Sequence, residues 1–189
     1  MNQILVLVDV QESFRHRDYW DERRAASFLA QANALVAHCD AHGVPIVRVY
    51  HCETAVDSPF NEASGYVRPL QGLMDFEAAL VVKKQKHSAL VGTKLLCWLR
   101  DRDITNVMIA GIRTEQCCET TTRHLSDEGF SVTFVTDATL TFDMTSPDGL
   151  PVSADDIHRR TETVLNKRFA SIAHVRNLVA DTCRDLAET

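Results

Sequence analysis

The chain has 189 residues, of which 45% are hydrophobic and 24% are charged, a composition typical of a globular domain with a sizeable core. Its net charge of −6 comes from 26 acidic and 20 basic residues that form no long run of either sign, so a nucleic-acid partner is not indicated. We expect a single cytoplasmic domain over residues 1–189 without membrane contact, because neither a signal peptide nor an apolar run of bilayer length is present.

Apolar runs of strand length alternate with amphipathic segments along the chain. The first run, residues 3–10 (QILVLVDV), is almost continuously aliphatic, as in a parallel strand that is covered on both faces. Further strands are predicted at residues 44–50, 79–82, 106–111, 131–136 and 169–173. Helices are predicted at residues 23–42, 90–101, 115–128, 154–167 and 175–186. This alternation predicts an α/β fold, a three-layer sandwich with a largely parallel six-stranded sheet.

Two long connections interrupt the alternation. Residues 54–77 and 137–152 contain several prolines and glycines and little periodicity, so each is predicted to be a loop. The first is expected to wrap the surface, or to form part of a lid or subunit contact, and the second to cross the carboxyl edge of the sheet. The charged segment 15–24 contains Tyr19 and Trp20, which we interpret as surface aromatics rather than as a shield over a cleft.

Reactive side chains stand at the ends of three predicted strands. Asp9 ends the first, Lys84 follows the third, and Cys117 lies in the first turn of the helix after the fourth. The carboxyl ends of parallel strands share one edge of the sheet, where ligands bind in open α/β folds. A helix N-terminus also favours a thiolate. Each residue has a plain alternative: a capping carboxylate, a solvated lysine and a buried small hydrophobe.

The cysteines and histidines give no metal-binding pattern. The six cysteines, at positions 39, 52, 97, 117, 118 and 183, contain no C-x-x-C pair and are expected to be reduced thiols. His51, Cys52 and Glu53 follow the second strand directly, but without an Asp-x-His-x-x-His cluster we interpret them as a solvated rim. We therefore expect no metal.

Three stretches, in this order, match a known family pattern. They are residues 7–14 (LVDVQESF), residues 84–95 (KQKHSALVGTKL) and residues 111–122 (GIRTEQCCETTT), and residues 129–138 add weaker similarity. Together they span most of the chain. The sequence resembles the isochorismatase-like cysteine hydrolases, which include nicotinamidases, carbamoylsarcosine amidases and isochorismatases, and the resemblance implies their Rossmann-like hydrolase fold.

The resemblance implies a catalytic triad of Asp9, Lys84 and Cys117. Lys84 and the helix N-terminus would lower the pKa of the Cys117 thiol by about 2 units, so that most of the sulfur is thiolate. Asp9 would take the thiol proton, pass it to the leaving group and later activate water. The sulfur would attack an acyl carbon and form a thioester, without a cofactor.

The resemblance also implies an oxyanion hole and a pocket. The oxyanion would be bound by the backbone N–H groups of Arg113 and Cys117, with a cis peptide between Ile112 and Arg113 that turns the Arg113 N–H toward the substrate. Gln11, Phe14 and Leu90 are candidate pocket residues. Leu90 stands where the family has an aromatic side chain, so the pocket wall is expected to differ from that of better-known relatives.

We therefore predict a metal-independent cysteine hydrolase that cleaves a small amide or related C–N bond in a small-molecule substrate. The missing Asp-x-His-x-x-His arrangement argues against nicotinamide as that substrate. One alternative is vinyl ether hydrolysis of the isochorismatase type, in which a C–O bond is cut and acid catalysis by Asp9 dominates. Another is a binding or assembly module that has the same fold without activity. By analogy with the family, a homodimer or homotetramer is expected.

Overall fold

The computed structural model describes residues 2–185 of the chain. Its main sheet has six strands in the order β3-β2-β1-β4-β5-β8, and each pair of neighbours is parallel. The strands are β1 (Gln3–Val8), β2 (Ile46–His51), β3 (Leu80–Lys84), β4 (Asn106–Ile112), β5 (Ser131–Leu140) and β8 (Ser171–Ala173). The predicted α/β class and six-stranded parallel sheet are therefore confirmed.

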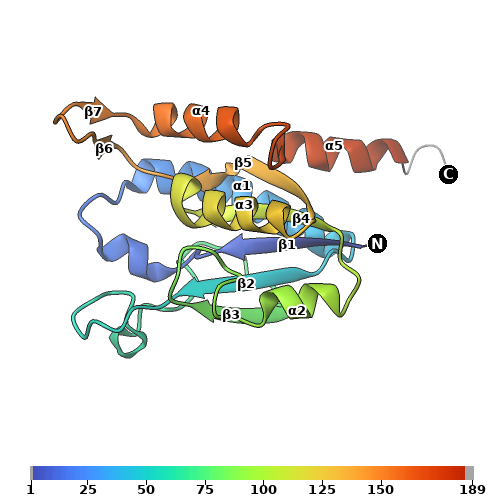
Figure 1. Ribbon diagram of the computed structural model, residues 1–189, viewed down its shortest axis with the longest axis horizontal. Helices are drawn as coiled ribbons and strands as arrows, with labels where there is room; N and C mark the ends of the chain where they lie inside the picture. Colours follow the sequence, from blue (N-terminus) through green and yellow to red (C-terminus); the bar gives the residue numbers. More distant parts are fainter. Residues whose placement is uncertain (1, 186–189) are drawn as a thin grey trace.

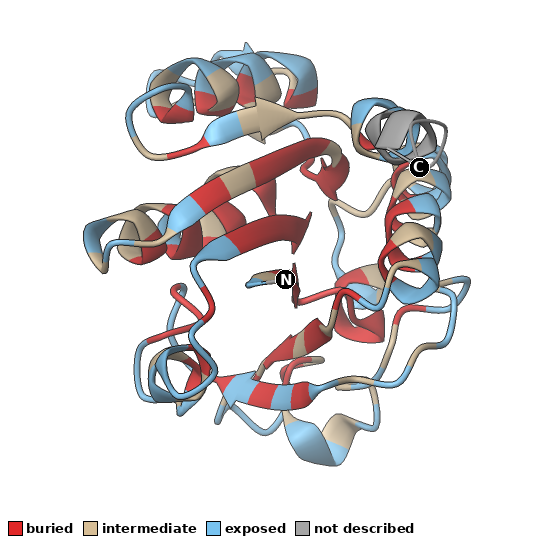
Figure 2. Ribbon diagram, turned by 90° about the vertical axis from the view of Figure 1, so that its right-hand side faces the viewer, coloured by how far each residue is buried: buried red, intermediate tan, exposed pale blue. Residues whose placement is uncertain are grey.

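Helices cover both faces of this sheet, as Figure 1 shows. The helices are α1 (Glu22–Ala41), α2 (Leu95–Arg100), α3 (Glu119–Asp127), α4 (Ala154–Leu165) and α5 (Val175–Asp185). Side chains of α1 and the first residue of α5 pack into one hydrophobic core, while those of α2, α3 and α4 pack into the other. The central strands lie between the two cores and are almost entirely buried, as Figure 2 shows. No helix within residues 2–185 has the length and apolarity that a bilayer crossing requires.

Several elements differ from the predicted ones. The helix predicted from residue 90 begins only at Leu95, because the Thr93 hydroxyl bonds the Ala89 carbonyl and the Leu95 N–H and holds the preceding residues in turns. The helix predicted at 115–128 is divided into a π-helical turn, Thr114–Cys118, followed by α3. Strand β5 extends to Leu140, past the predicted end at residue 136, with an irregular register against β4.

The two predicted loops carry short elements of their own. Residues 54–77 contain a 3-10 turn, Glu62–Ser64, and are tied to the segment after β1 by a bridge between Gln11 and Pro69. Leu70 of this connection is buried in the core on the α1 side of the sheet. The second connection contains a two-stranded hairpin of β6 (Met144–Thr145) and β7 (Pro151–Val152). The first connection therefore packs against the body of the protein, whereas residues 143–152, which include the hairpin, are exposed or only partly buried.

Strands β1 and β4 approach each other closely at Gly111. This glycine has a φ of +132°, and a Cβ added there would lie 1.9 Å from the carbonyl oxygen of Val8. Only a residue without a side chain fits between the two backbones. Gly111 therefore sets the spacing of the two strands whose ends carry Asp9 and the turn with Cys117.

We expect Gly111→Ala to lower the free energy of unfolding by about 3 kcal/mol or more, because the new methyl group forces β1 and β4 apart. Gly149→Ala is the matched control: its φ is also positive, at +85°, but nothing lies within 4 Å of the added Cβ. We expect this control to lose only about 1 kcal/mol in urea unfolding. Equal losses in the two variants would contradict the proposed constraint.

Candidate active site

The structure brings Asp9, Lys84 and Cys117 together at the carboxyl edge of the sheet. The Lys84 ammonium donates to Asp9 Oδ2 at 2.7 Å and lies 3.3 Å from Cys117 Sγ. Exposure of the three residues is 0%, 2% and 6%, respectively. A thiol, an amine and a carboxylate thus share one almost dry site, although they lie 33 and 75 positions apart along the chain.

The strand order explains why a long side chain is needed at position 84. Asp9 follows β1 directly and adopts a φ of +53°, a left-handed conformation that aspartate tolerates better than most residues. Lys84 is the last residue of β3, which β2 separates from β1. Its side chain must therefore reach past the end of β2, where its Nζ lies 3.4 Å from His51 Nδ1. Lysine provides this reach together with a fixed charge.

Asp9 and Lys84 form an ion pair that is fully buried. Burial raises the pKa of Asp9 above its ordinary value, although the charge of Lys84 acts in the opposite direction. Burial also disfavours the charged form of Lys84, but the negative charge of Asp9 and the hydrogen bonds to Asp9 and Cys117 outweigh this and raise the pKa of Lys84. Asp9 Oδ1 is buried and has no hydrogen-bond partner among the residues described. Oδ1 of Asp9 can therefore accept a proton.

The thiol of Cys117 is neutral at rest, and the predicted lowering of its pKa is wrong. Burial, followed by the charge of Asp9, raises the pKa of Cys117 to about 12. Lys84 lowers it, but the Lys84 charge is already offset by Asp9 at 2.7 Å. The ammonium favours a thiolate, but desolvation of the buried sulfur outweighs it. The thiol can therefore become a nucleophile only by giving its proton to a neighbour.

The backbone beside the sulfur offers a hydrogen-bond donor. The peptide bond between Ile112 and Arg113 is cis. Among residues 2–185, no acceptor binds the N–H of Arg113, whereas its carbonyl accepts from Gln116 and Cys118. The Arg113 guanidinium lies 4.9 Å from the Tyr19 ring and pairs with Glu115 at 3.0 Å. A free N–H is thus held next to the turn that carries Cys117.

The three candidate pocket residues are all buried. Gln11 accepts from the N–H of His51 and donates to its carbonyl, so its amide joins the ends of β1 and β2. Phe14 packs in the core with its ring 4.9 Å from that of Phe60. Leu90 belongs to the core on the opposite face of the sheet. These contacts are structural, and the pocket role of the three residues stays a prediction.

Two interpretations of surface residues are wrong. His51 is not part of a solvated rim: its side chain is only 16% exposed, and burial, followed by the charge of Lys84, lowers its pKa to about 4. Tyr19 and Trp20 are partly buried against Phe142 rather than free on the surface. Both errors arise because the connections after β2 and β5 fold back over these side chains, which spacing along the sequence does not reveal.

One neighbour of the sulfur was missed. The Nδ1 atom of His87 lies 3.8 Å from Cys117 Sγ, although the sequence showed this histidine only as the end of a basic loop. Its place inside the family motif, three positions after Lys84, was the available signal.

Within the described residues, no group of three or more His, Cys, Asp or Glu side chains is arranged to hold a metal ion. The described cysteines, at positions 39, 52, 97, 117 and 118, are free.

The lowered pKa of His51 predicts acid sensitivity of the fold. Between about pH 6.5 and 4 the unfolded chain binds a proton at His51 and the folded chain does not, so stability falls as the pH falls through this range. We expect His51→Gln to reduce the loss of unfolding free energy between pH 7 and 4.5 by about 2 kcal/mol, allowing for the part of the ring that meets water. An identical pH dependence in wild type and His51→Gln would contradict this assignment.

Comparisons with known proteins agree with the fold. Residues 3–151 match the family model of the isochorismatase domain. Over 177 residues the chain is 26% identical to the isochorismatase family protein YrdC of Bacillus subtilis (strain 168), and the match covers 94% of each chain. Over 62 residues it is 42% identical to nicotinamidase 3 of Arabidopsis thaliana, and this match covers 33% of this chain and 31% of that one.

Two solved structures have similar folds. An isochorismatase-family protein from Chromobacterium violaceum ATCC 12472 superposes with a TM-score of 0.87 at 23% identity, covering 95% of this chain and 93% of that one. N-carbamoylsarcosine amidase from Thermoplasma acidophilum superposes with a TM-score of 0.71 at 18% identity, covering 93% and 97%. The match of the family model over most of the chain shows that this protein belongs to the isochorismatase family of hydrolases.

Proposed function

We propose that the protein is a metal-independent cysteine hydrolase that cleaves a small amide or related C–N bond through a thioester. The observation that carries this proposal is the position of the Lys84 ammonium, 2.7 Å from the carboxylate of Asp9 and 3.3 Å from the sulfur of Cys117. A carboxylate that can take a proton and a cation that can hold a thiolate are what a buried thiol needs in order to react.

The reaction begins with a proton transfer inside the triad. Because the pKa of Asp9 is raised by burial and its Oδ1 is unbonded, the carboxylate can accept the Cys117 proton when a substrate arrives. Lys84 remains charged and its partner changes from the carboxylate to the new thiolate. The total charge of the buried site stays constant, so no charge has to be brought in from water.

The thiolate then attacks the acyl carbon, and negative charge develops on the acyl oxygen. The unbonded N–H of Arg113 is one donor for this oxyanion, and the N–H of Cys117 is the second. A donor of this kind is worth about 10²- to 10³-fold in rate. Collapse of the intermediate breaks the C–N bond and leaves an acyl group on the sulfur, which water hydrolyses.

The choice of C–N over C–O cleavage is part of the proposal, and the names of two relatives motivate it. Nicotinamidase 3 and N-carbamoylsarcosine amidase are, by name, enzymes that act on amide-type bonds. A vinyl ether hydrolase would need acid catalysis by Asp9 and no attack by sulfur, so the two reactions differ in their need for Cys117. A homo-oligomer, as the family resemblance implies, remains part of the proposal, and light scattering tests it.

Loss of the nucleophile tests the main proposal. On a panel of small amides, carbamoyl compounds and isochorismate, we expect Cys117→Ala to lose about 10⁴-fold or more in kcat, and Asp9→Asn about 10²- to 10⁴-fold, with the fold retained by circular dichroism. Mass spectrometry of acid-quenched wild type should show an acyl adduct on Cys117. Turnover retained in Cys117→Ala would favour C–O cleavage, and no turnover of any compound by the wild type would favour a binding module.

Loss of the cation should raise the pKa of the thiol. In Lys84→Met the attraction that holds a thiolate is gone, so alkylation of Cys117 by iodoacetamide should slow by about tenfold or more at pH 8. Lys83→Met is the matched control, because Lys83 is the preceding residue of β3 and pairs with Glu62 at the surface. An unchanged pH profile of alkylation in Lys84→Met would remove Lys84 from the site.

A further inference from the structure

The Lys84 ammonium has a third partner, which the catalytic triad does not include. An ammonium has three protons to donate and no lone pair with which to accept. Its three side-chain acceptors among residues 2–185 are Asp9 Oδ2 at 2.7 Å, Cys117 Sγ at 3.3 Å and His51 Nδ1 at 3.4 Å. Since Lys84 is only 2% exposed, its ammonium depends on these three acceptors in place of water.

The sheet places His51 directly beside Lys84. The two residues are register partners at the ends of β2 and β3, so their side chains stand on the same face of the sheet. The N–H of Cys52 donates to the Lys84 carbonyl at 2.8 Å and continues the pairing by one residue. Gln11 bonds both backbone groups of His51. The backbone around His51 is thus bonded to the two segments that carry Lys84 and Asp9.

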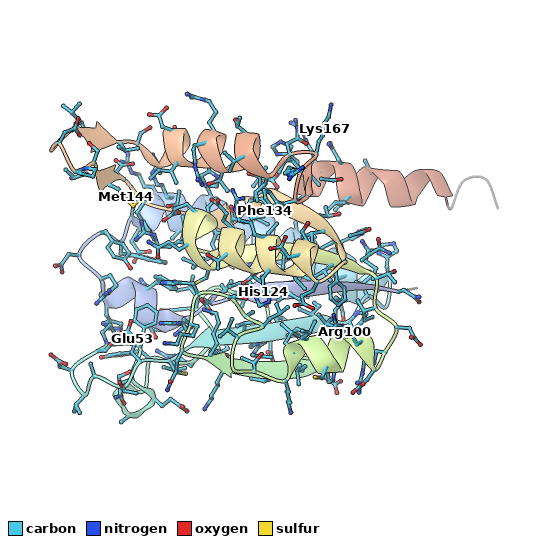
Figure 3. All side chains as sticks on the ribbon, in the orientation of Figure 1. Glu53, Arg100, His124, Phe134, Met144 and Lys167 are labelled. Atoms are coloured by element: carbon cyan, nitrogen blue, oxygen red, sulfur yellow. The ribbon has the colours of Figure 1, made fainter. Side chains whose placement is uncertain are left out.

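The imidazole of His51 is held by the connection that follows β2. Its Nε2 lies 3.7 Å from Oε1 of Glu53, whose other carboxylate oxygen accepts from the hydroxyl of Ser58 at 2.6 Å. The ring of Phe60 stands edge-on to the imidazole, with the two centroids 5.7 Å apart. Figure 3 labels Glu53 just beyond the end of β2. The ring is therefore held at Nε2 by the Glu53 carboxylate, with Nδ1 turned to Lys84.

The contact with Lys84 also assigns the tautomer of His51. An ammonium can only donate, so a hydrogen bond to it requires an Nδ1 without a proton. Burial, followed by the charge of Lys84, lowers the pKa of His51 to about 4, which keeps the ring neutral near pH 7. Geometry and charge therefore agree on a neutral imidazole with its proton on Nε2, where it faces Glu53.

We propose that His51 is a positioning residue, which holds the Lys84 ammonium through Nδ1 while Asp9 and Cys117 exchange a proton. This inference rests on the proposed function, in which that proton transfer starts the reaction. Asp9 loses its negative charge in the transfer and the sulfur gains one, so the bonds from Lys84 to these two groups change in strength. The imidazole stays neutral throughout, and it therefore keeps the ammonium in place between them.

Two variants of similar size test this role without any substrate. In His51→Asn an amide oxygen replaces Nδ1 at the same number of bonds from the backbone, whereas His51→Leu has no acceptor. Because a buried charge loses a hydrogen bond, we expect alkylation of Cys117 by iodoacetamide at pH 8 to slow by about tenfold in His51→Leu and by less than about threefold in His51→Asn. Tandem mass spectrometry locates the adduct on Cys117. His51→Phe, which keeps a ring but no acceptor, should be slowed as in His51→Leu.

The same substitution in a Lys84→Met background shows whether His51 acts through the ammonium. With no cation to hold, adding His51→Leu should slow alkylation by less than about twofold beyond Lys84→Met alone. Equal rates in His51→Leu and His51→Asn, or a loss that persists in the Lys84→Met background, would overturn the assignment of His51. Failure of the proposed function has a different signature, since Cys117→Ala would then retain turnover while the alkylation rates stay as expected.

Discussion

The ion pair between Asp9 and Lys84 is the interaction on which the site depends. Removal of two charges from water costs several kcal/mol for each ion, and only close geometry offsets it. Here the two side chains have 0% exposure and meet at 2.7 Å. The ends of β1 and β3 have to be held in register for this to occur, and the amide of Gln11, bonded to both backbone groups of His51 on the intervening β2, contributes to that alignment.

The pair also determines the resting state of the nucleophile. A lone ammonium beside Cys117 would favour a thiolate, but an ammonium that is already neutralised leaves the thiol protonated, with its pKa raised to about 12. In the proposed mechanism, the sulfur therefore stays a thiol until a bound substrate makes the proton transfer favourable. A raised pKa and burial together make the resting thiol a poor target for oxidation and unspecific alkylation.

The fold was predictable because its signals are local. Continuous aliphatic runs such as residues 3–10 identify buried parallel strands, and the polar residue that ends each run must then lie at one edge of the sheet. These signals predict that Asp9, Lys84 and Cys117 lie at the same edge. The family motif added the position of the cis peptide at Ile112 and Arg113, which the residues alone do not indicate.

The features that the sequence did not predict depend on how deeply a side chain is buried and on the course of the loops around it. The raised pKa of Cys117 follows from desolvation, and the degree of desolvation is known only once Leu90 and the loop after β3 are in place. The contact of His87 with the sulfur depends on hydrogen bonds from that loop to α3. Tyr19 is covered by Phe142, more than a hundred positions away. Such contacts leave no periodicity in the sequence.

The place of Lys84 in the sheet has a further consequence. Strand β3 lies at the edge and has β2 as its single neighbour, whereas β1 and β4, next to Asp9 and Cys117, are central. Edge strands fray at a lower free energy than the middle of a sheet. On warming, we therefore expect Lys84 to lose its contacts with Asp9 and Cys117 first. Thermal inactivation should then precede global unfolding and be reversible on cooling.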